Sequence, residues 1–182
     1  MIELLLFLIG SLGIIWLSRT ALLRPFTHGF PRFFAFEALL GLVLLNAHHW
    51  LIQPFSFPQM LSWVLLLGSF FLIIYTIWTF RAHGAIYPGI EDVGRLAYEK
   101  TTRLVTQGPY RFIHHPMYAS LFYLAWGVFL KQITLLSGLL ALIVSLTLFL
   151  TAVYEERENQ KIFGEEYIEY MKRTKRFIPF VF

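Results

Sequence analysis

The 182-residue sequence contains no cysteine. This excludes disulfides, thiolate metal sites, a cysteine nucleophile and self-prenylation. Charge is also scarce, because Asp, Glu, Lys and Arg make up 14% of the residues, against about 25% in soluble domains. Hydrophobic residues make up 57% and the mean hydropathy is +0.62. This composition places the chain in the membrane class, with a length that suits one domain.

Several common motifs are absent as well. The sequence has no glycine-rich nucleotide motif after a strand, so no Rossmann cofactor domain is expected. It has no internal repeat and no low-complexity segment. The adjacent His48 and His49 lie on different helix faces and make a poor metal pair, so no metal site is expected. The net charge of +4 needs no nucleic-acid partner, and nothing in the sequence implies an obligate protein partner.

The apolar residues gather in five runs, each of which predicts a membrane-spanning helix. Glu3 and the lack of a small-residue cleavage site indicate that the first run is a retained span rather than a signal peptide. We therefore predict an all-α integral membrane protein with about five transmembrane helices. The runs are Ile2 to Leu17 (partly resumed to Leu23), Phe33 to Ile52, Met60 to Phe80, Met117 to Leu130 and Thr134 to Tyr154.

Positive charge is distributed unequally between the two predicted sides. With five spans, fourteen of the fifteen Lys and Arg residues lie on one side, and Lys131 lies alone on the other. The positive-inside rule then predicts an external N-terminus, with the long loop from Arg81 to Ile113 and the C-terminal tail in the cytoplasm.

Two polar clusters stand at the cytoplasmic edge of the last two predicted spans. His114 and His115 directly precede Pro116, which suits the first turn of a helix. The N–H groups at such a helix start favour an anion. Because Lys131 to Thr134 is a short connection, the last two spans form an antiparallel hairpin that brings the histidines near Glu155 and Glu156. This arrangement predicts a pocket for a ligand that carries both a carboxylate and a cation.

Several ordered blocks of the sequence together resemble a known family. They are Leu-Val-Thr-Gln-Gly-Pro-Tyr at 104–110, His-Pro-Met-Tyr at 115–118, Glu-Glu at 155–156, Phe-Gly-Glu-Glu-Tyr-Ile-Glu-Tyr at 163–170 and Ile-Pro at 178–179. In this order and spacing they resemble the isoprenylcysteine carboxyl methyltransferases, a family related to the membrane phospholipid methyltransferases. The resemblance covers about residues 80–182.

The resemblance implies S-adenosylmethionine as the methyl donor, bound in a cytoplasmic pocket with a lipid-side entrance for a lipophilic substrate. It implies that residues 81–182 form the catalytic region, in one domain with the three N-terminal helices at 1–80. If the acceptor is an amine or a phenol, Glu156 or His114 would serve as the base. The implied cofactor contacts are Arg95, Thr102, Arg103, Leu104, Val105, Tyr110, His115, Pro116, Met117, Tyr118 and Glu155.

The sequence departs from the family at three positions. His114 replaces an arginine, Ser120 replaces a glycine, and Thr151 stands where carboxylate-methylating members place an arginine. The last difference weakens the case for a carboxylate acceptor such as a prenylcysteine, relative to a lipid amine or hydroxyl. Two alternatives remain: a membrane reductase of the sterol-reductase kind that uses NADPH, and a non-catalytic membrane protein with the same fold.

Three other groups of polar residues lie outside the predicted cofactor site. Glu158 and Lys161 are three apart and are expected to form an exposed ion pair. Tyr167 and Tyr170 are expected to dock the tail by packing. Glu37 is an intramembrane carboxylate near Arg32, and such a group is a functional candidate by default.

Overall fold

A computed structural model describes residues 2–84 and 103–181. Arg95 and Thr102, which the resemblance places at the cofactor, lie outside these residues. Every regular element in the described ranges is helical. The elements are α1 (Ile2–Leu22), α2 (Gly29–Leu45), the 3-10 helix η1 (Ala47–His49), α3 (Phe57–His83), the 3-10 helix η3 (Gly108–Arg111), α4 (Pro116–Phe129), α5 (Leu135–Phe163) and α6 (Glu165–Arg173).

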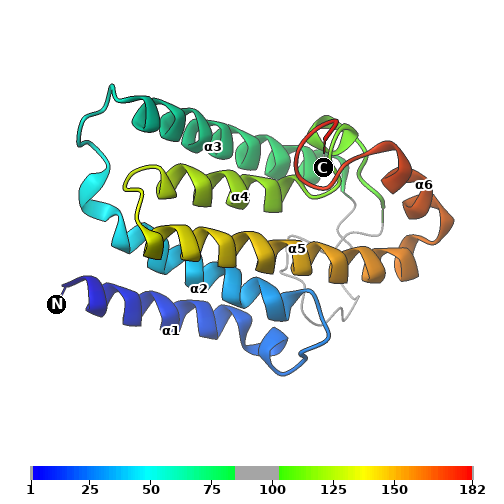
Figure 1. Ribbon diagram of the computed structural model, residues 1–182. Helices are drawn as coiled ribbons and strands as arrows, with labels where there is room; N and C mark the ends of the chain where they lie inside the picture. The colour runs from blue at the N-terminus through cyan, green and yellow to red at the C-terminus, as the bar shows by residue number, and fades with distance from the viewer. Residues whose placement is uncertain (1, 85–102, 182) are drawn as a thin grey trace.

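The five longest helices lie side by side in a bundle, and α6 sits beyond one end of it (Figure 1). Helix α4 packs mainly on α3 and also on α5, while α2 packs between α1 and α5. The C-terminal segment after α6 returns to the end of the bundle where α4 begins. This end therefore gathers the start of α4, the end of α5 and the tail.

Three helices are long and apolar enough to cross a bilayer, namely α1, α3 and α5. Their outward apolar side chains are exposed, for example Trp16 at 68% and Phe71 at 64%. The residues packed between helices are mostly small, such as Ala119, Ala125 and Ala141, each at 0%. Exposed large apolar residues around an interior of small ones are what a lipid environment favours. The predicted all-helical membrane protein is confirmed at this level.

The predicted boundary of one run is wrong. Helix α2 ends at Leu45 rather than Ile52, because Asn46 caps it: the Asn46 side chain donates to the Leu42 carbonyl at 2.9 Å. The apolar run that ends at Tyr154 covers only the first part of α5, which continues through a charged segment of helical pattern to Phe163. The predicted carboxylate pair thus stands on the same continuous helix as the apolar run before it, which fixes its direction rigidly.

Polar side chains of α3 attach α4 to it along its length. Ser69 donates to the Ser120 carbonyl at 2.7 Å, Ser62 donates to the Gly127 carbonyl at 2.6 Å, and Gln59 donates to the Lys131 carbonyl at 2.9 Å. Ser120 itself is 1% exposed, so serine at the usual glycine position does not open this interface. These bonds hold the start of α4, where the histidines stand.

The opposite end of the bundle is closed around Lys131. Its ammonium lies 3.7 Å from the centre of the Trp63 ring and 3.2 Å from the side-chain oxygen of Gln59. It also donates to the Trp50 carbonyl at 3.4 Å. Lys131 is 4% exposed, so this end is packed rather than open.

Candidate functional site

A glycine shapes the entry to the site. Gly108 begins η3 with φ +57°, and a Cβ built on it would lie 2.5 Å from the hydroxyl of Thr79. Only glycine combines this left-handed backbone with so close an approach. The turn that follows buries Tyr110 and leads to His114 and His115. Pro116 then occupies the first turn of α4, as predicted.

The tail after α6 pairs with the backbone of this segment. Ile113 forms a parallel bridge with Lys175. The His114 N–H donates to the Lys175 carbonyl at 2.8 Å, and the Lys175 N–H donates to the Phe112 carbonyl at 3.0 Å. The His115 N–H donates to the Arg176 carbonyl at 3.2 Å. The residues at 112–115 are therefore held by a segment some sixty positions later in the chain.

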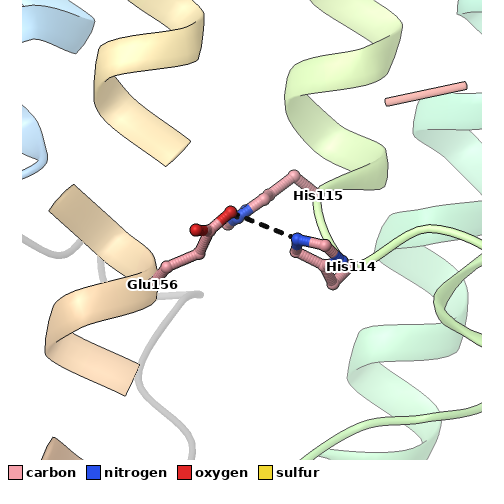
Figure 2. Close-up of side chains that lie close together, drawn as sticks. All are labelled: His114, His115 and Glu156. Atoms are coloured by element: carbon pink, nitrogen blue, oxygen red, sulfur yellow. Dashed lines mark hydrogen bonds and ion pairs between the residues drawn. The ribbon is translucent and has the colours of Figure 1, made fainter. Parts of the chain in front are cut away.

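The two histidines face Glu156 (Figure 2), and His115 also lies near Glu155, as the predicted hairpin requires. His114 Nε2 lies 3.2 Å from Glu156 Oε1, and His115 Nε2 lies 3.4 Å from the same oxygen. His115 Nδ1 lies 3.6 Å from Glu155 Oε2. His115 therefore stands between the two carboxylates, and His114 contacts one of them.

A cation that sequence reasoning missed completes this cluster. Arg176 binds both oxygens of Glu156, with Nε at 2.7 Å from Oε1 and Nη2 at 3.0 Å from Oε2. The bond to Glu156 raises the pKa of Arg176. Burial lowers the pKa of His114 despite its bond to Glu156, so His114 is neutral at pH 7. Position 114 thus carries no fixed charge, and the guanidinium beside Glu156 comes from the tail.

The same cluster has a composition that binds metal ions. One ligand atom each from His114, His115 and Glu156 lie within 4.8 Å of one another. However, the guanidinium of Arg176 already occupies both oxygens of Glu156. The guanidinium of Arg176 would repel a metal ion and fills the space beside the Glu156 oxygens where the ion would bind. The geometry therefore favours an ion-paired network over a metal centre.

A pocket opens beside the cluster and encloses about 580 Å³, its mouth included. Ten predicted site residues line it: Arg103, Leu104, Val105, Tyr110, His114, His115, Pro116, Met117, Tyr118 and Glu155. Glu156 does not, because its carboxylate turns to Arg176 on the other side of the histidines. The described residues among the predicted cofactor contacts are thus gathered around one space.

Five further residues line the pocket and were not predicted as site residues: Phe80, Asn159, Phe163, Tyr167 and Tyr170. Asn159 and Phe163 follow Glu155 at intervals of four, so they lie on the same face of α5. This spacing was the signal that would have found them. Tyr167 and Tyr170 dock the tail as predicted, and Tyr170 donates to the Tyr110 carbonyl at 2.6 Å. They also form a wall of the pocket.

The predicted interactions of two other carboxylates change. Glu158 does not form the expected exposed pair with Lys161; it accepts from the His28 N–H at 3.0 Å and meets His28 Nδ1 at 2.6 Å. Glu37, the candidate carboxylate within α2, accepts from the Ser11 hydroxyl of α1 at 2.7 Å. The two contacts join residues that are 130 and 26 positions apart, and local spacing does not predict them.

Comparison with known proteins agrees with the blocks around this pocket. The phospholipid methyltransferase family model matches residues 57–166, which include α3, the pocket turn, α4 and α5. The chain belongs to the phospholipid methyltransferase family.

The curated relatives that the chain matches have names more specific than the name of the family. Protein-S-isoprenylcysteine O-methyltransferase of Homo sapiens is 38% identical over 85 residues, covering 44% of this chain and 29% of that protein. The Mus musculus protein of the same name is 36% identical over the same length and shares. Protein-S-isoprenylcysteine O-methyltransferase B of Arabidopsis thaliana is 33% identical over 87 residues, covering 46% of this chain and 43% of that protein. The match therefore spans less than half the length of these relatives. No solved structure matches the chain.

Proposed function

We propose that this protein transfers a methyl group from S-adenosylmethionine to a lipophilic acceptor at the cytoplasmic face of a membrane. The observation that carries the proposal is the pocket in which His115 and Glu155 meet at the end of an apolar bundle. The family membership favours methyl transfer over the reductase alternative. The names of the relatives indicate isoprenylcysteine as their acceptor.

The pocket residues fit the chemical groups of this cofactor. The start of α4 with His115 suits the methionyl carboxylate, because the N–H groups and positive end of a helix favour an anion. Glu155 suits the amino group or a ribose hydroxyl. Tyr110 and Tyr118 present aromatic surface, which attracts a sulfonium. When bound, the cofactor would supply an electrophilic methyl group.

The chain's own residues contribute positioning and, for some acceptors, a base. Orientation of two reactants supplies much of the rate of such a displacement. A carboxylate acceptor needs no base. For an amine or hydroxyl acceptor, His114 lines the pocket and would accept the proton after one ring nitrogen leaves its partner, since Nδ1 lies 3.0 Å from the Thr174 hydroxyl and Nε2 lies 3.2 Å from Glu156. Glu156 is the second candidate base and lies 3.2 Å from His114.

Thr151 is the residue that bears on the chemical class of the acceptor. This residue is 0% exposed, and its hydroxyl donates to the Thr147 carbonyl of its own helix at 2.7 Å. It therefore offers no cation to an acceptor carboxylate. This absence favours a lipid amine or hydroxyl, while the names of the relatives favour a prenylcysteine-like carboxylate. Both classes remain in the proposal.

The membrane orientation in this proposal has five passes. Helices α2 and α4 have 17 and 14 residues, or about 25 and 21 Å of helix, and are shorter than the three clear spans. The contacts at the two ends of α2 support opposite sides for these ends. The turn before α2 contacts α5 near its end through His28 and Glu158, whereas the segment after α2 contacts the connection between α4 and α5 through Trp50 and Lys131. Both short helices therefore run alongside the long α5.

Calorimetric titration of the purified protein with S-adenosylhomocysteine and with NADPH tests the cofactor. We expect binding of the first only. Glu155→Gln should weaken it by about 10–100-fold, since a bond to a charged group contributes roughly 1.5–3 kcal/mol. The matched control is Glu166→Gln, an exposed carboxylate outside the pocket. Binding of NADPH alone would establish the reductase alternative, and binding of neither would establish a non-catalytic protein.

A second experiment identifies the acceptor. Membrane lipid extracts and a prenylcysteine are each incubated with methyl-labelled S-adenosylmethionine and the protein. Label in an alkali-labile ester would identify a carboxylate acceptor, and label in an alkali-stable product would identify an amine or hydroxyl. If the wild-type protein binds S-adenosylhomocysteine but labels neither the lipid extract nor the prenylcysteine, methyl transfer to these acceptors is contradicted.

A further inference from the structure

Arg176 does not line the proposed cofactor pocket. Its guanidinium binds Glu156, which contacts the two histidines at the edge of that pocket. We propose that Arg176 is a positioning residue, which sets the orientation of His115 in the cofactor pocket by holding Glu156. The proposal rests on the proposed function, because it concerns the same pocket. It assigns a role to the tail after α6.

The first step is the fixed orientation of Glu156. The guanidinium of Arg176 contacts both carboxylate oxygens, at 2.7 and 3.0 Å. Two parallel bonds fix the plane of a carboxylate as well as its distance. The guanidinium also lies 5.2 Å from the centre of the Phe149 ring on α5, which limits its own movement. Glu156 is 7% exposed, so water offers little competition for these bonds.

The second step leads from Glu156 to the pocket. Its Oε1 lies 3.4 Å from Nε2 of His115, while Nδ1 of the same ring lies 3.6 Å from Glu155. Nε2 of His115 is buried and makes no hydrogen bond within the described part of the chain, so its contact with Glu156 is electrostatic and favours an N–H that points toward the carboxylate. With Oε1 of Glu156 held by Arg176, Nε2 faces Glu156 and Nδ1 faces Glu155. The side chain of Arg176 thereby influences the orientation of His115 through Glu156, without a hydrogen bond to the His115 ring itself.

The third step is the rigid attachment of Arg176 itself. Its carbonyl accepts from the His115 N–H at 3.2 Å, so backbone and side chain both tie it to the cluster. The next residue, Phe177, is 3% exposed and its ring stacks on Phe122 at 6.3 Å. The hydroxyl of Tyr123 donates to the Phe177 carbonyl at 3.0 Å. The segment 174–177 is thus docked on α4 on one side and reaches α5 on the other.

The chemistry of the contact distinguishes arginine from lysine. A lysine ammonium is a point charge on a flexible stem and does not reproduce a two-pronged contact. We therefore expect Arg176→Lys to preserve the charge but lose part of the orientation. Lys175 provides a matched control, because it is adjacent in the same segment and its side chain is exposed.

The test measures the affinity of the purified protein for S-adenosylhomocysteine in a double-mutant cycle. We expect Arg176→Gln to weaken binding about 10-fold and Arg176→Lys about 3-fold, with Lys175→Gln unchanged. In a Glu156→Gln background, Arg176→Gln should have no further effect, because the route through Glu156 has already been removed. A general loss of packing would instead reduce affinity equally in both backgrounds.

Thermal unfolding in detergent identifies variants that are folded. If Arg176→Gln is not folded, the affinity of Arg176→Lys for S-adenosylhomocysteine is the test. Wild-type affinity of Arg176→Lys would then overturn the proposal. An equal loss for Arg176→Gln with and without Glu156→Gln would also overturn it, as would wild-type affinity of Arg176→Gln. Absence of binding by the wild-type protein would instead contradict the cofactor assignment itself, so the two failures are distinguished.

Discussion

His28 lies in the turn before α2, yet its side chain is 1% exposed and bonds to Glu158, which is 130 positions later. Burial opposes protonation of His28, but the bond to Glu158 and the charges of Glu155 and Glu158 outweigh it. They also outweigh the nearby Arg32, so the pKa of His28 is raised above its ordinary 6.5. The contact between His28 and Glu158 links the start of α2 to the polar end of α5.

The raised pKa makes this link dependent on pH. A histidine whose pKa is higher in the folded state binds more protons there, so its contribution is complete below pH 6.5 and fades as pH rises through the folded pKa. We expect Glu158→Gln to reduce the free energy of unfolding by about 2 kcal/mol at pH 6, and by less at pH 9. Apparent melting temperatures of both proteins across this range measure the difference.

The control for this prediction is Glu169→Gln, which removes an exposed carboxylate paired with Lys172. It should leave the melting temperature unchanged at both pH values. A destabilisation by Glu158→Gln that is larger at pH 9 than at pH 6 would contradict a cationic His28.

At the scale of elements, η3 is the turn that joins α3 to the pocket. It depends on Gly108, whose φ of +57° and contact with Thr79 leave no room for a side chain. We expect Gly108→Ala to destabilise the fold by about 2–4 kcal/mol, from left-handed backbone strain and overpacking together. It should also weaken binding of S-adenosylhomocysteine, because Tyr110 in the same turn lines the pocket.

The controls separate the two costs. Gly68 lies on α3, and a Cβ added to it would meet nothing within 4 Å, so Gly68→Ala should not destabilise the protein. Adding Thr79→Ala to Gly108→Ala removes the clashing atoms and should restore part of the loss, leaving the backbone strain. If Gly108→Ala melts at the wild-type temperature, the turn is less constrained than its geometry indicates.

The elements that the sequence predicted well are those set by local patterns. The apolar runs predict α3 and α4 closely, since Pro116 marks a helix start and few polar residues interrupt the runs. The end of α2 was missed because a single buried side chain, Asn46, decides it. The apolar run covers only the first part of α5, because the helix continues through the charged residues Glu155 and Glu156, whose segment is helical in pattern up to Gly164.

The site was predicted where motifs carry it and missed where distant segments meet. His115, Tyr118 and Glu155 belong to short recognisable blocks, and the structure gathers them around one pocket. Arg176 belongs to no block, and its role appears only through contacts across 20 and 61 positions, to Glu156 and His115. Local spacing contains no information on such pairings.

For the molecule as a whole, the proposed five passes place Phe55 and the α6 helix on opposite sides of the membrane. Because the chain has no cysteine, single cysteines introduced at exposed Phe55 and Glu166 report their side without background. In intact cells, we expect a membrane-impermeant maleimide to label Phe55→Cys directly. Glu166→Cys should be labelled only after permeabilisation.

Each variant carries its own control, since labelling in detergent should reach both positions equally. Labelling of both cysteines in intact cells, or of Glu166→Cys alone, would contradict the proposed orientation. Labelling of neither before permeabilisation would contradict an outward Phe55 loop and the five passes with it.

The pairing of residues 112–115 with the segment 174–177 also orders the events of biosynthesis. During translation the segment 174–177 emerges after all of the described helices, so α1 to α5 can be inserted while the polar cluster still lacks Arg176. Newly inserted chains would thus pass through a stage with a bundle but without a completed pocket. On this view the proposed cofactor pocket is completed only after the described helices have formed, when the segment 174–177 pairs with residues 112–115.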